Sequence, residues 1–171
     1  QNHADFIFYP CIPYERNEFP DSNNHYNCPI VTSYAENIKN NVDEITSGKI
    51  RLLNPFLSFA SRDTLAKQLK SVFEKEFSIA PEEVQKAVDA GWQELALMRE
   101  DIQRKGEETL KYMEETGLRG IVLAGRPYHI DSEINHGIPE LINSYRIAVL
   151  TEDSVSHLQK VERPLLVMDQ W

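Results

Sequence analysis

The stretch that decides the fold is GIVLAGRPYHIDSEINHGIPELINSYRIAVL, residues 120–150. It begins with a strongly apolar run at 120–124 and ends with a second apolar run at 147–150, and both are typical of buried strands. Between the two runs, Asp131 and Pro139 are residue types that begin helical turns. A strand, a loop, a helix and another strand at this spacing predict a βαβ unit with parallel strands.

The rest of the chain extends this pattern in both directions. Apolar residues spaced by three and four predict helices that begin at Ser33, Ser61 and Pro81, where capping or first-turn residues stand. The helix from Pro81 is expected to run to Thr116, with a break at Gly106 as an alternative. Further strands are expected at residues 4–9, 29–32, 50–53 and 164–168, and a long irregular loop at 10–27.

These elements predict a three-layer α/β fold with a mostly parallel sheet, flavodoxin-like or Rossmann-like, to which one long helix or helical hairpin is appended. A chain of 171 residues has the size of a single domain. We expect residues 1–60 and 117–171 to form the sheet, and residues 61–116 to be a helical insertion. Both ends of the sequence lie next to expected strands, which favours an excised piece of a longer chain.

Composition and charge argue against several classes of protein. Apolar residues make up 41% and charged residues 26% of the chain, as in soluble globular proteins, which argues against disordered and fibrous chains. A net charge of −9 disfavours nucleic acid as a partner. The apolar runs are too short to span a membrane, and no secretory signal is recognisable. Two cysteines are too few for a disulfide scaffold, so we expect a reduced, cytoplasmic protein.

The two cysteines, Cys11 and Cys28, are candidate metal or cluster ligands. Cys11 follows the first expected strand, and the carboxyl ends of parallel strands face the ligand crevice. Cys28 stands beside Pro29, where a rigid backbone can present an accessible thiolate. The alternative is that both are free, half-buried thiols, because their separation matches no standard ligand spacing. A zinc site that combines Cys11 and Cys28 with His3 and His25 is a further alternative.

The relative position of the cysteines depends on the segment that begins at Pro29. If residues 29–32 form a strand of the same sheet, Cys11 and Cys28 lie at opposite edges of that sheet. If Pro29 begins a helix instead, both cysteines can share one mouth. The sequence leaves both alternatives open.

A polar turn follows the apolar run at 120–124. Arg126 and His129 stand at the carboxyl end of this expected strand, where they can bind an anion such as a phosphate of a coenzyme. Asn135 and His136 follow, and His136 is a candidate general acid or base. The structural alternatives are a tight turn with a surface arginine and a histidine held by hydrogen bonds. The sequence contains no GxGxxG turn, phosphate-binding Walker loop, HExxH motif or nucleophile elbow.

Five strings carry a resemblance to a known family. They are FYPC at 8–11, NHYNCPIV at 24–31, LAGRPYH at 123–129, EINHGIP at 133–139 and VLTEDS at 149–154. In this order they resemble a region of the large CoA-substrate-specific enzyme activase proteins, which are related to 2-hydroxyacyl-CoA dehydratases and their ATP-dependent activators. The resemblance covers most of the chain and is strongest towards its two ends.

The resemblance implies a fusion protein. Its ATPase modules would precede this region and a dehydratase-like region would follow it; both are expected partners, and ATP would be bound there and not here. In dehydratase-like proteins, three cysteine thiolates hold a 4Fe-4S cluster that passes a low-potential electron to a thioester, driven by ATP hydrolysis. The resemblance therefore implies Cys11 and Cys28 as cluster ligands, with a third ligand outside this chain.

The resemblance also implies roles for the polar turn. Arg126, His129 and Asn135 become candidate cofactor-binding residues, and His129 and His136 candidate catalytic residues. We therefore expect a dehydratase-related or activase protein, inactive as this isolated region, that contributes to a cluster site and has an acyl-CoA as a candidate ligand. The alternatives are a non-catalytic α/β scaffold that docks the ATPase and dehydratase-like regions, and a zinc-stabilised domain.

Overall fold

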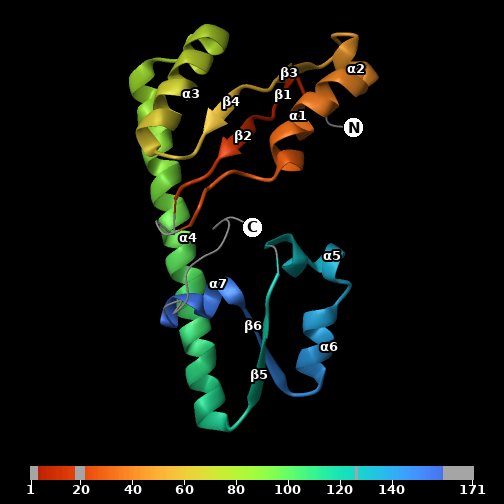
Figure 1. The fold of residues 1–171 in the computed structure, drawn as a ribbon, viewed down its shortest axis with the longest axis vertical. Coiled ribbons are helices and arrows are strands. Elements are labelled where there is room, and N and C mark those ends of the chain that lie inside the picture. Colours follow the sequence, from red (N-terminus) through yellow and green to blue (C-terminus); the bar gives the residue numbers. More distant parts are fainter. Residues whose placement is uncertain (1–3, 18–21, 126, 160–171) are drawn as a thin grey trace. The chain divides into compact units, whose positions relative to one another are not determined.

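The computed structural model describes residues 4–17, 22–125 and 127–159 (Figure 1). The described chain divides into two compact units. Unit 1 comprises the described residues up to Trp92, and unit 2 comprises those from Gln93 onward. Among the described residues, unit 1 has two strand pairs and unit 2 has one. The single domain expected from the sequence stays a prediction.

Unit 1 contains two pairs of short parallel strands. They are β1 (Phe6–Phe8) with β3 (Arg51–Leu53), and β2 (Cys11–Tyr14) with β4 (Phe56–Ser58). Between the pairs, the amide of Tyr9 donates to the carbonyl of Leu53 and the amide of Cys11 donates to the carbonyl of Pro55, both at 2.9 Å. The second pair therefore continues directly from the first. Proline, which has no amide to donate, stands at both junctions: Pro10 between β1 and β2, and Pro55 between β3 and β4.

Helices pack on these strands, and Figure 1 shows β2 and β4 between α1 (Pro29–Asn41) and α3 (Arg62–Phe77). On the α1 side, Ala35 and Cys11 are both 0% exposed. On the α3 side, the apolar core of unit 1 includes residues of β4, α3 and the first turns of α4 (Pro81–Thr116). Its buried members are Leu57, Leu65, Ala66, Val84 and Val88. A short helix, α2 (Asp43–Thr46), leads from α1 to β3.

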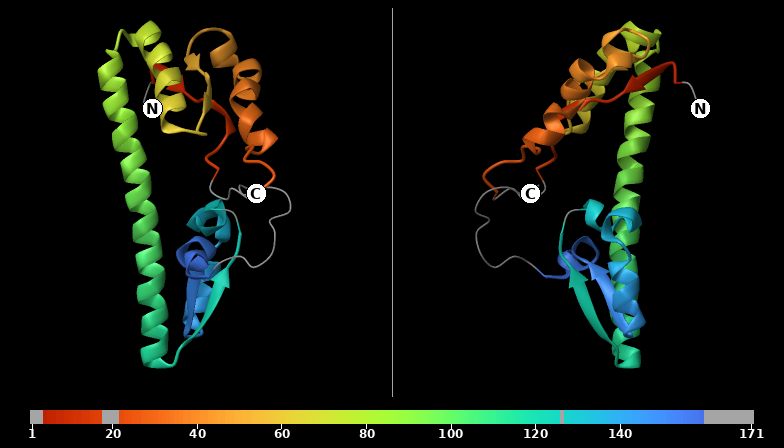
Figure 2. Two further views of the ribbon diagram at one scale, coloured as in Figure 1. Left: turned by 60° about the vertical axis from the view of Figure 1, so that its left-hand side comes forward. Right: turned by 90° about the vertical axis from the view of Figure 1, so that its right-hand side faces the viewer.

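Unit 2 contains a complete βαβ crossover. Figure 2 shows β5 (Arg119–Leu123) beside β6 (Ile147–Thr151), and the two are paired in parallel along their whole length. The crossover between them consists of a 3-10 turn η1 (Pro127–Ile130) and the helices α5 (Ser132–Asn135) and α6 (Ile138–Ser144). After β6 come α7 (Glu152–Val155) and a second 3-10 turn η2 (Ser156–Leu158). The strand–helix–strand prediction for residues 120–150 is thus confirmed.

Several predicted helix boundaries are confirmed. The hydroxyl of Ser61 accepts a hydrogen bond from the amide of Thr64 at 3.2 Å, as expected of an N-cap. The carboxylate of Asp131 accepts hydrogen bonds from the amides of Glu133 and Ile134 at the start of α5. Helix α4 begins at Pro81 and ends at Thr116, and it passes through Gly106 without the alternative break.

Other predictions for unit 1 are wrong. Residues 29–32 are not a strand, because α1 begins at Pro29, a residue type suited to the first helical turn, so Ser33 lies inside the helix and does not cap it. Residues 11–14, expected in a loop, form β2. The parallel partner β4 supplies the backbone hydrogen bonds, and the local sequence does not predict this pairing. The predicted strand at 164–168 lies outside the described residues.

The structure therefore supports a more general fold class than the one predicted. The described residues form mixed α and β structure, with short parallel strand pairs and one long helix. Each described sheet has two strands, which is fewer than a flavodoxin-like or Rossmann-like three-layer fold requires.

Candidate functional site

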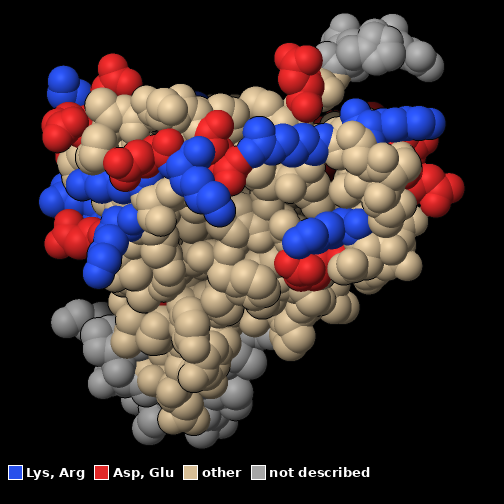
Figure 3. Space-filling model, turned by 90° about the horizontal axis from the view of Figure 1, so that it is seen from above, with Lys and Arg blue, Asp and Glu red and all other residues tan. Residues whose placement is uncertain are grey.

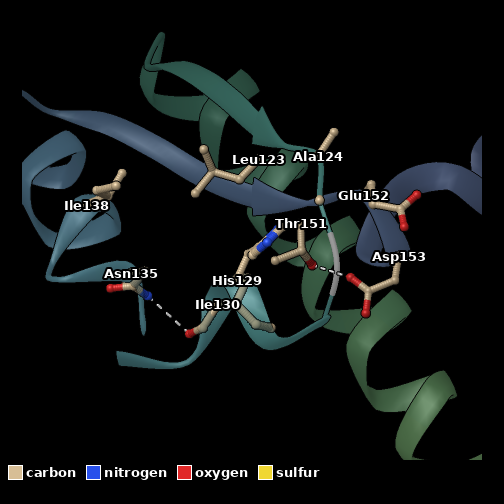
Figure 4. Close-up of a pocket in the computed structure, with 10 residues that line it drawn as sticks. Leu123, Ala124, His129, Ile130, Asn135, Ile138, Thr151, Glu152 and Asp153 are labelled. Atoms are coloured by element: carbon tan, nitrogen blue, oxygen red, sulfur yellow. Dashed lines mark hydrogen bonds between the residues drawn. The ribbon is translucent and has the colours of Figure 1, made fainter. Parts of the chain in front are cut away.

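A pocket lies in unit 2 at the carboxyl ends of β5 and β6 (Figure 4). Its volume is about 200 Å³. Because the strands are parallel, Leu123 and Thr151 end them at the same level, and the loops that follow both strands meet at this edge. The lining residues are Leu123, Ala124, Gly125, His129, Ile130, Asn135, Ile138, Thr151, Glu152 and Asp153.

The acidic side of the pocket comes directly after β6. The hydroxyl of Thr151, the last residue of that strand, donates a short hydrogen bond to the carboxylate of Asp153. Figure 4 shows this bond, with Glu152 on the same segment. The bond holds the Asp153 carboxylate at the pocket, where it can accept further hydrogen bonds from a ligand.

The opposite side of the pocket is formed by the turn that follows β5. A Cβ added to Gly125 would lie 2.5 Å from Nδ1 of His129, so any larger residue at this position would force the imidazole to move. The ring of Tyr128 meets the His129 ring edge-on, with 4.4 Å between the ring centroids. These contacts place the His129 ring at the wall of the pocket.

Asn135, the last residue of α5, lines the pocket and is 8% exposed. Its Nδ2 donates to the carbonyl of Ile130 at 3.2 Å, and its Oδ1 accepts from the amide of Gly137 at 2.9 Å (Figure 4 shows the first bond). Asn135 therefore holds two pocket-forming turns together. His136 is exposed, has a left-handed backbone with φ of 52°, and does not line the pocket.

The structure thus brings two sequence-predicted residues together, His129 and Asn135. Arg126 lies outside the described residues. Sequence reasoning missed Thr151, Glu152 and Asp153, which it used only as part of a family string. The available signal was positional, because residues directly after the second strand of a βαβ unit lie beside the turn that follows the first strand.

The predicted thiol ligands lie in unit 1, and Cys11, the first residue of β2, is fully buried where β2 packs against α1. Burial raises the pKa of the Cys11 thiol above its ordinary value, and a hydrogen bond with the Glu36 main chain partly opposes this. Cys28 is partly exposed and directly precedes α1, where its amide donates to Oδ1 of Asn27 at 2.9 Å. Neither cysteine forms a disulfide.

The start of α1 lies against β2. The amide of Thr32 donates to the carbonyl of Cys28 at 2.9 Å, and its hydroxyl donates to the carbonyl of Ile12 at 3.4 Å. The Cys11 thiol, however, meets α1 near Glu36, which lies eight positions after Cys28, a rise of about 12 Å along a helix. Cys28 therefore stands at the N-terminal end of α1, and Cys11 lies against the same helix about two turns further along.

A cluster or zinc ion requires more than these two thiols. Within the described ranges, no group of three His, Cys, Asp or Glu side chains is arranged to hold a metal ion. The His25 ring packs with those of Tyr14 and Tyr26, and His3 lies outside the described residues. The described side chains do not by themselves fit a 4Fe-4S cluster, which needs further thiolates.

Comparison with known families assigns the chain. The sequence profile of the CoA enzyme activase uncharacterised domain (DUF2229) matches residues 1–155. The chain belongs to this CoA enzyme activase family. No curated protein and no solved structure gives a significant match.

The surface of the activase-family domain shows mixed charge on the face seen in Figure 3, where Lys and Arg side chains lie among Asp and Glu side chains. In unit 1, for example, Nε of Arg62 is 3.5 Å from Oδ1 of Asp89, and Arg51 pairs with Glu76. That face therefore does not concentrate one sign of charge. Among the described helices, none combines the length and apolar character needed to cross a bilayer.

Proposed function

We propose that this activase-family domain binds a small organic ligand in the pocket at the ends of β5 and β6. The observation that carries the proposal is the meeting of His129 with the Thr151–Asp153 pair at the carboxyl ends of two parallel strands. This edge is where open α/β structures bind ligands. A few polar groups against an apolar wall are typical of small-molecule sites, and Leu123, Ile130 and Ile138 supply that wall.

The pocket suits one part of a ligand and not a whole coenzyme. Small-molecule pockets usually measure about 300–1,000 Å³, whereas this one holds about 200 Å³. We assign it to one end of a larger molecule, for which an acyl-CoA remains a candidate. The ATPase and dehydratase-like regions implied by the resemblance are the proposed partners, and they would bind ATP themselves.

A thermal-shift panel tests the proposed function. The 171-residue chain is heated with CoA, acyl-CoA esters, pantetheine, nucleosides, nucleotides and 2-hydroxy acids. A ligand present at about 100 times its Kd stabilises a folded protein by about 2.7 kcal/mol, so at least one compound should raise Tm by several degrees.

The Asp153→Asn variant should lose most of that shift, because it removes the charge of the carboxylate that Thr151 holds at the pocket. Glu115→Gln removes one charge from an exposed position on α4 in the same unit and should keep it. If no compound raises Tm, or if every compound acts equally on the Asp153→Asn variant, the pocket is not a binding site.

A contribution to a 4Fe-4S cluster is a second candidate function. The specific observation in its favour is that α1 begins at Pro29 and lies against β2, so Cys28 and Cys11 belong to one βα unit. Cys28 is partly exposed and is the more available ligand, whereas Cys11 would have to be uncovered first. Because the described thiols do not complete a cluster, further ligands must come from elsewhere.

Anaerobic reconstitution of a longer chain that includes the dehydratase-like region tests this second function. Absorbance and electron spin resonance spectra are compared for wild type, Cys28→Ser and Cys11→Ser. Loss of the cluster signal in Cys28→Ser supports the contribution. A normal cluster in both variants rules out these cysteines as ligands.

A further inference from the structure

We propose that the ligand end bound in the β5–β6 pocket is a ribose with free hydroxyl groups, as in a nucleoside, and that the acidic segment after β6 selects against a phosphorylated ribose. This inference rests on the proposed function, because it names the ligand class of the same pocket. Three features carry it: the position of Asp153 in the βαβ unit, the hydrogen-bonding capacity of the pocket, and its size.

The first feature is position. In βαβ units that bind nucleotides, an acidic residue just after the second strand accepts hydrogen bonds from the ribose hydroxyls, beside the glycine turn that follows the first strand. Here Gly125 belongs to the turn after β5, and Asp153 lies two residues beyond the end of β6. The turn lacks the other glycines of a pyrophosphate-binding loop. The comparison therefore supports a sugar contact and does not support a diphosphate cradle.

The second feature is hydrogen-bonding capacity. A carboxylate accepts hydrogen bonds, so Asp153 and Glu152 suit a ligand that offers donors at this side of the pocket. Thr151 already donates to one oxygen of Asp153 and thereby orients the group. The adjacent hydroxyls of a ribose supply the donors that a carboxylate binds in pairs. A phosphate on either hydroxyl would remove a donor and place like charges side by side.

The third feature is size and surface. An apolar cavity of about 150 Å³ holds a benzene ring, and this pocket measures about 200 Å³. One sugar ring with part of an attached base therefore fits, and a dinucleotide does not. The side chains of Leu123, Ile130 and Ile138 provide an apolar surface for the face of that base.

The inference makes a prediction about CoA itself. The ribose of CoA carries a 3′-phosphate, so the 3′-phosphoadenosine end of CoA should bind this pocket more weakly than an unmodified adenosine. A cation that binds the phosphate would give the opposite preference. Arg126 follows Gly125 in sequence and lies outside the described residues, so the experiment includes a variant of it.

Heteronuclear NMR titration of the ¹⁵N-labelled 171-residue chain tests the inference. The probes are adenosine, 3′-deoxyadenosine and adenosine 3′-monophosphate. Adenosine should move the amide signals of residues 123–125 and 151–153. For 3′-deoxyadenosine and adenosine 3′-monophosphate, the affinity should be lower than that of adenosine by a factor of about ten or more, because each lacks one hydrogen bond to a charged group.

Variants assign the selectivity to the acidic segment. Asp153→Asn keeps an oxygen that accepts from Thr151, so the fold should be retained, and its Tm is measured as a check. This variant should bind adenosine about tenfold more weakly than wild type does, and the difference in affinity between adenosine and adenosine 3′-monophosphate should become smaller. Glu115→Gln, an exposed charge on α4, should leave both affinities unchanged.

The outcomes separate this inference from the proposed function. If adenosine leaves the pocket signals unmoved while pantetheine or another compound of the thermal-shift panel, titrated in the same way, moves them, the ribose assignment is wrong and the binding function stands. If adenosine 3′-monophosphate binds more tightly than adenosine, and Arg126→Ala abolishes that preference, the pocket is a phosphate site and the inference is overturned. If neither these probes nor the compounds of the thermal-shift panel move these signals, both proposals fail.

Discussion

Gly106 of α4 lies directly against the backbone of Ser154 in α7, and a Cβ built at position 106 would be 2.1 Å from the Ser154 carbonyl oxygen. Both residues belong to unit 2. On the next residue of α4, Oε1 of Glu107 is 2.8 Å from Nε2 of His157. A glycine in the middle of a long helix is therefore explained by a close approach of the segment that follows β6 and forms one side of the pocket.

Replacing Gly106 with alanine should destabilise the protein. Alanine favours the helix by about 1 kcal/mol over glycine, but its methyl group would collide with the backbone of Ser154, which cannot rotate away. Overpacking of this kind typically costs about 1–3 kcal/mol, and a backbone clash lies at the upper end. We expect a net loss of about 1–2 kcal/mol, measured by denaturant unfolding.

The same helix supplies a matched control. A Cβ added at Gly91 would meet nothing within 4 Å, so Gly91→Ala should stabilise the protein by up to about 1 kcal/mol through helix propensity. If both substitutions stabilise the chain, the packing of α7 on α4 described above is incorrect.

Gly125→Ala should disturb the pocket without unfolding unit 2. The added methyl group would displace the imidazole of His129, whose Nδ1 lies 2.5 Å from the Cβ position. We expect weaker binding of any pocket ligand, measured by titration calorimetry. The double variant Gly125→Ala/His129→Ala removes the obstructing ring, so the two changes should be non-additive. Strict additivity would show that His129 and Gly125 are independent.

The two cysteines should differ in reactivity. Cys11 is 0% exposed and burial raises its pKa, so few thiolates form there, whereas Cys28 is partly exposed. In the native chain, iodoacetamide should modify Cys28 much faster, as measured by peptide mass spectrometry. After denaturation the two rates should become similar. Equal rates in the native chain would contradict the burial of Cys11 beneath α1.

Two serines distinguish the observed helix starts from those expected from sequence. Ser61 accepts the Thr64 amide at the start of α3, so Ser61→Ala should cost about 1 kcal/mol. Ser33 lies within α1, where its hydroxyl contacts the carbonyl of Ile30 at 3.5 Å and caps nothing. Ser33→Ala should therefore change the free energy of unfolding by less than about 0.5 kcal/mol. Equal losses of unfolding free energy in the two variants would indicate that Ser33 also caps a helix.

The sequence predicted those parts of the fold that local chemistry determines. The βαβ unit at 120–150 could be recognised because its strands are apolar and Asp131 is an N-cap. The start of α4 at Pro81 followed from the same kind of signal. Family strings pointed to His129 and Asn135, which both line the pocket.

What the sequence could not predict depends on tertiary partners. Cys11 lies in a strand although Pro10 and Pro13 surround it, because β4 provides the pairing. Pro29 suits either the start of a strand or a first helical turn. In the structure it begins α1, and this helix packs on β2. Gly106 resembled a helix break because its contact, Ser154, is distant in sequence. Asp153 was missed because its importance comes from the parallel register of β5 and β6.

The central claim is that the domain binds its ligand at the carboxyl ends of β5 and β6. The most direct measurement is chemical-shift mapping of the ligand that gives the largest thermal shift. The account predicts that the amides of residues 123–125 and 151–153 move on binding and that Asp153→Asn abolishes these changes. Changes confined to the surroundings of Cys28 and Cys11, with the pocket signals unmoved, would contradict it.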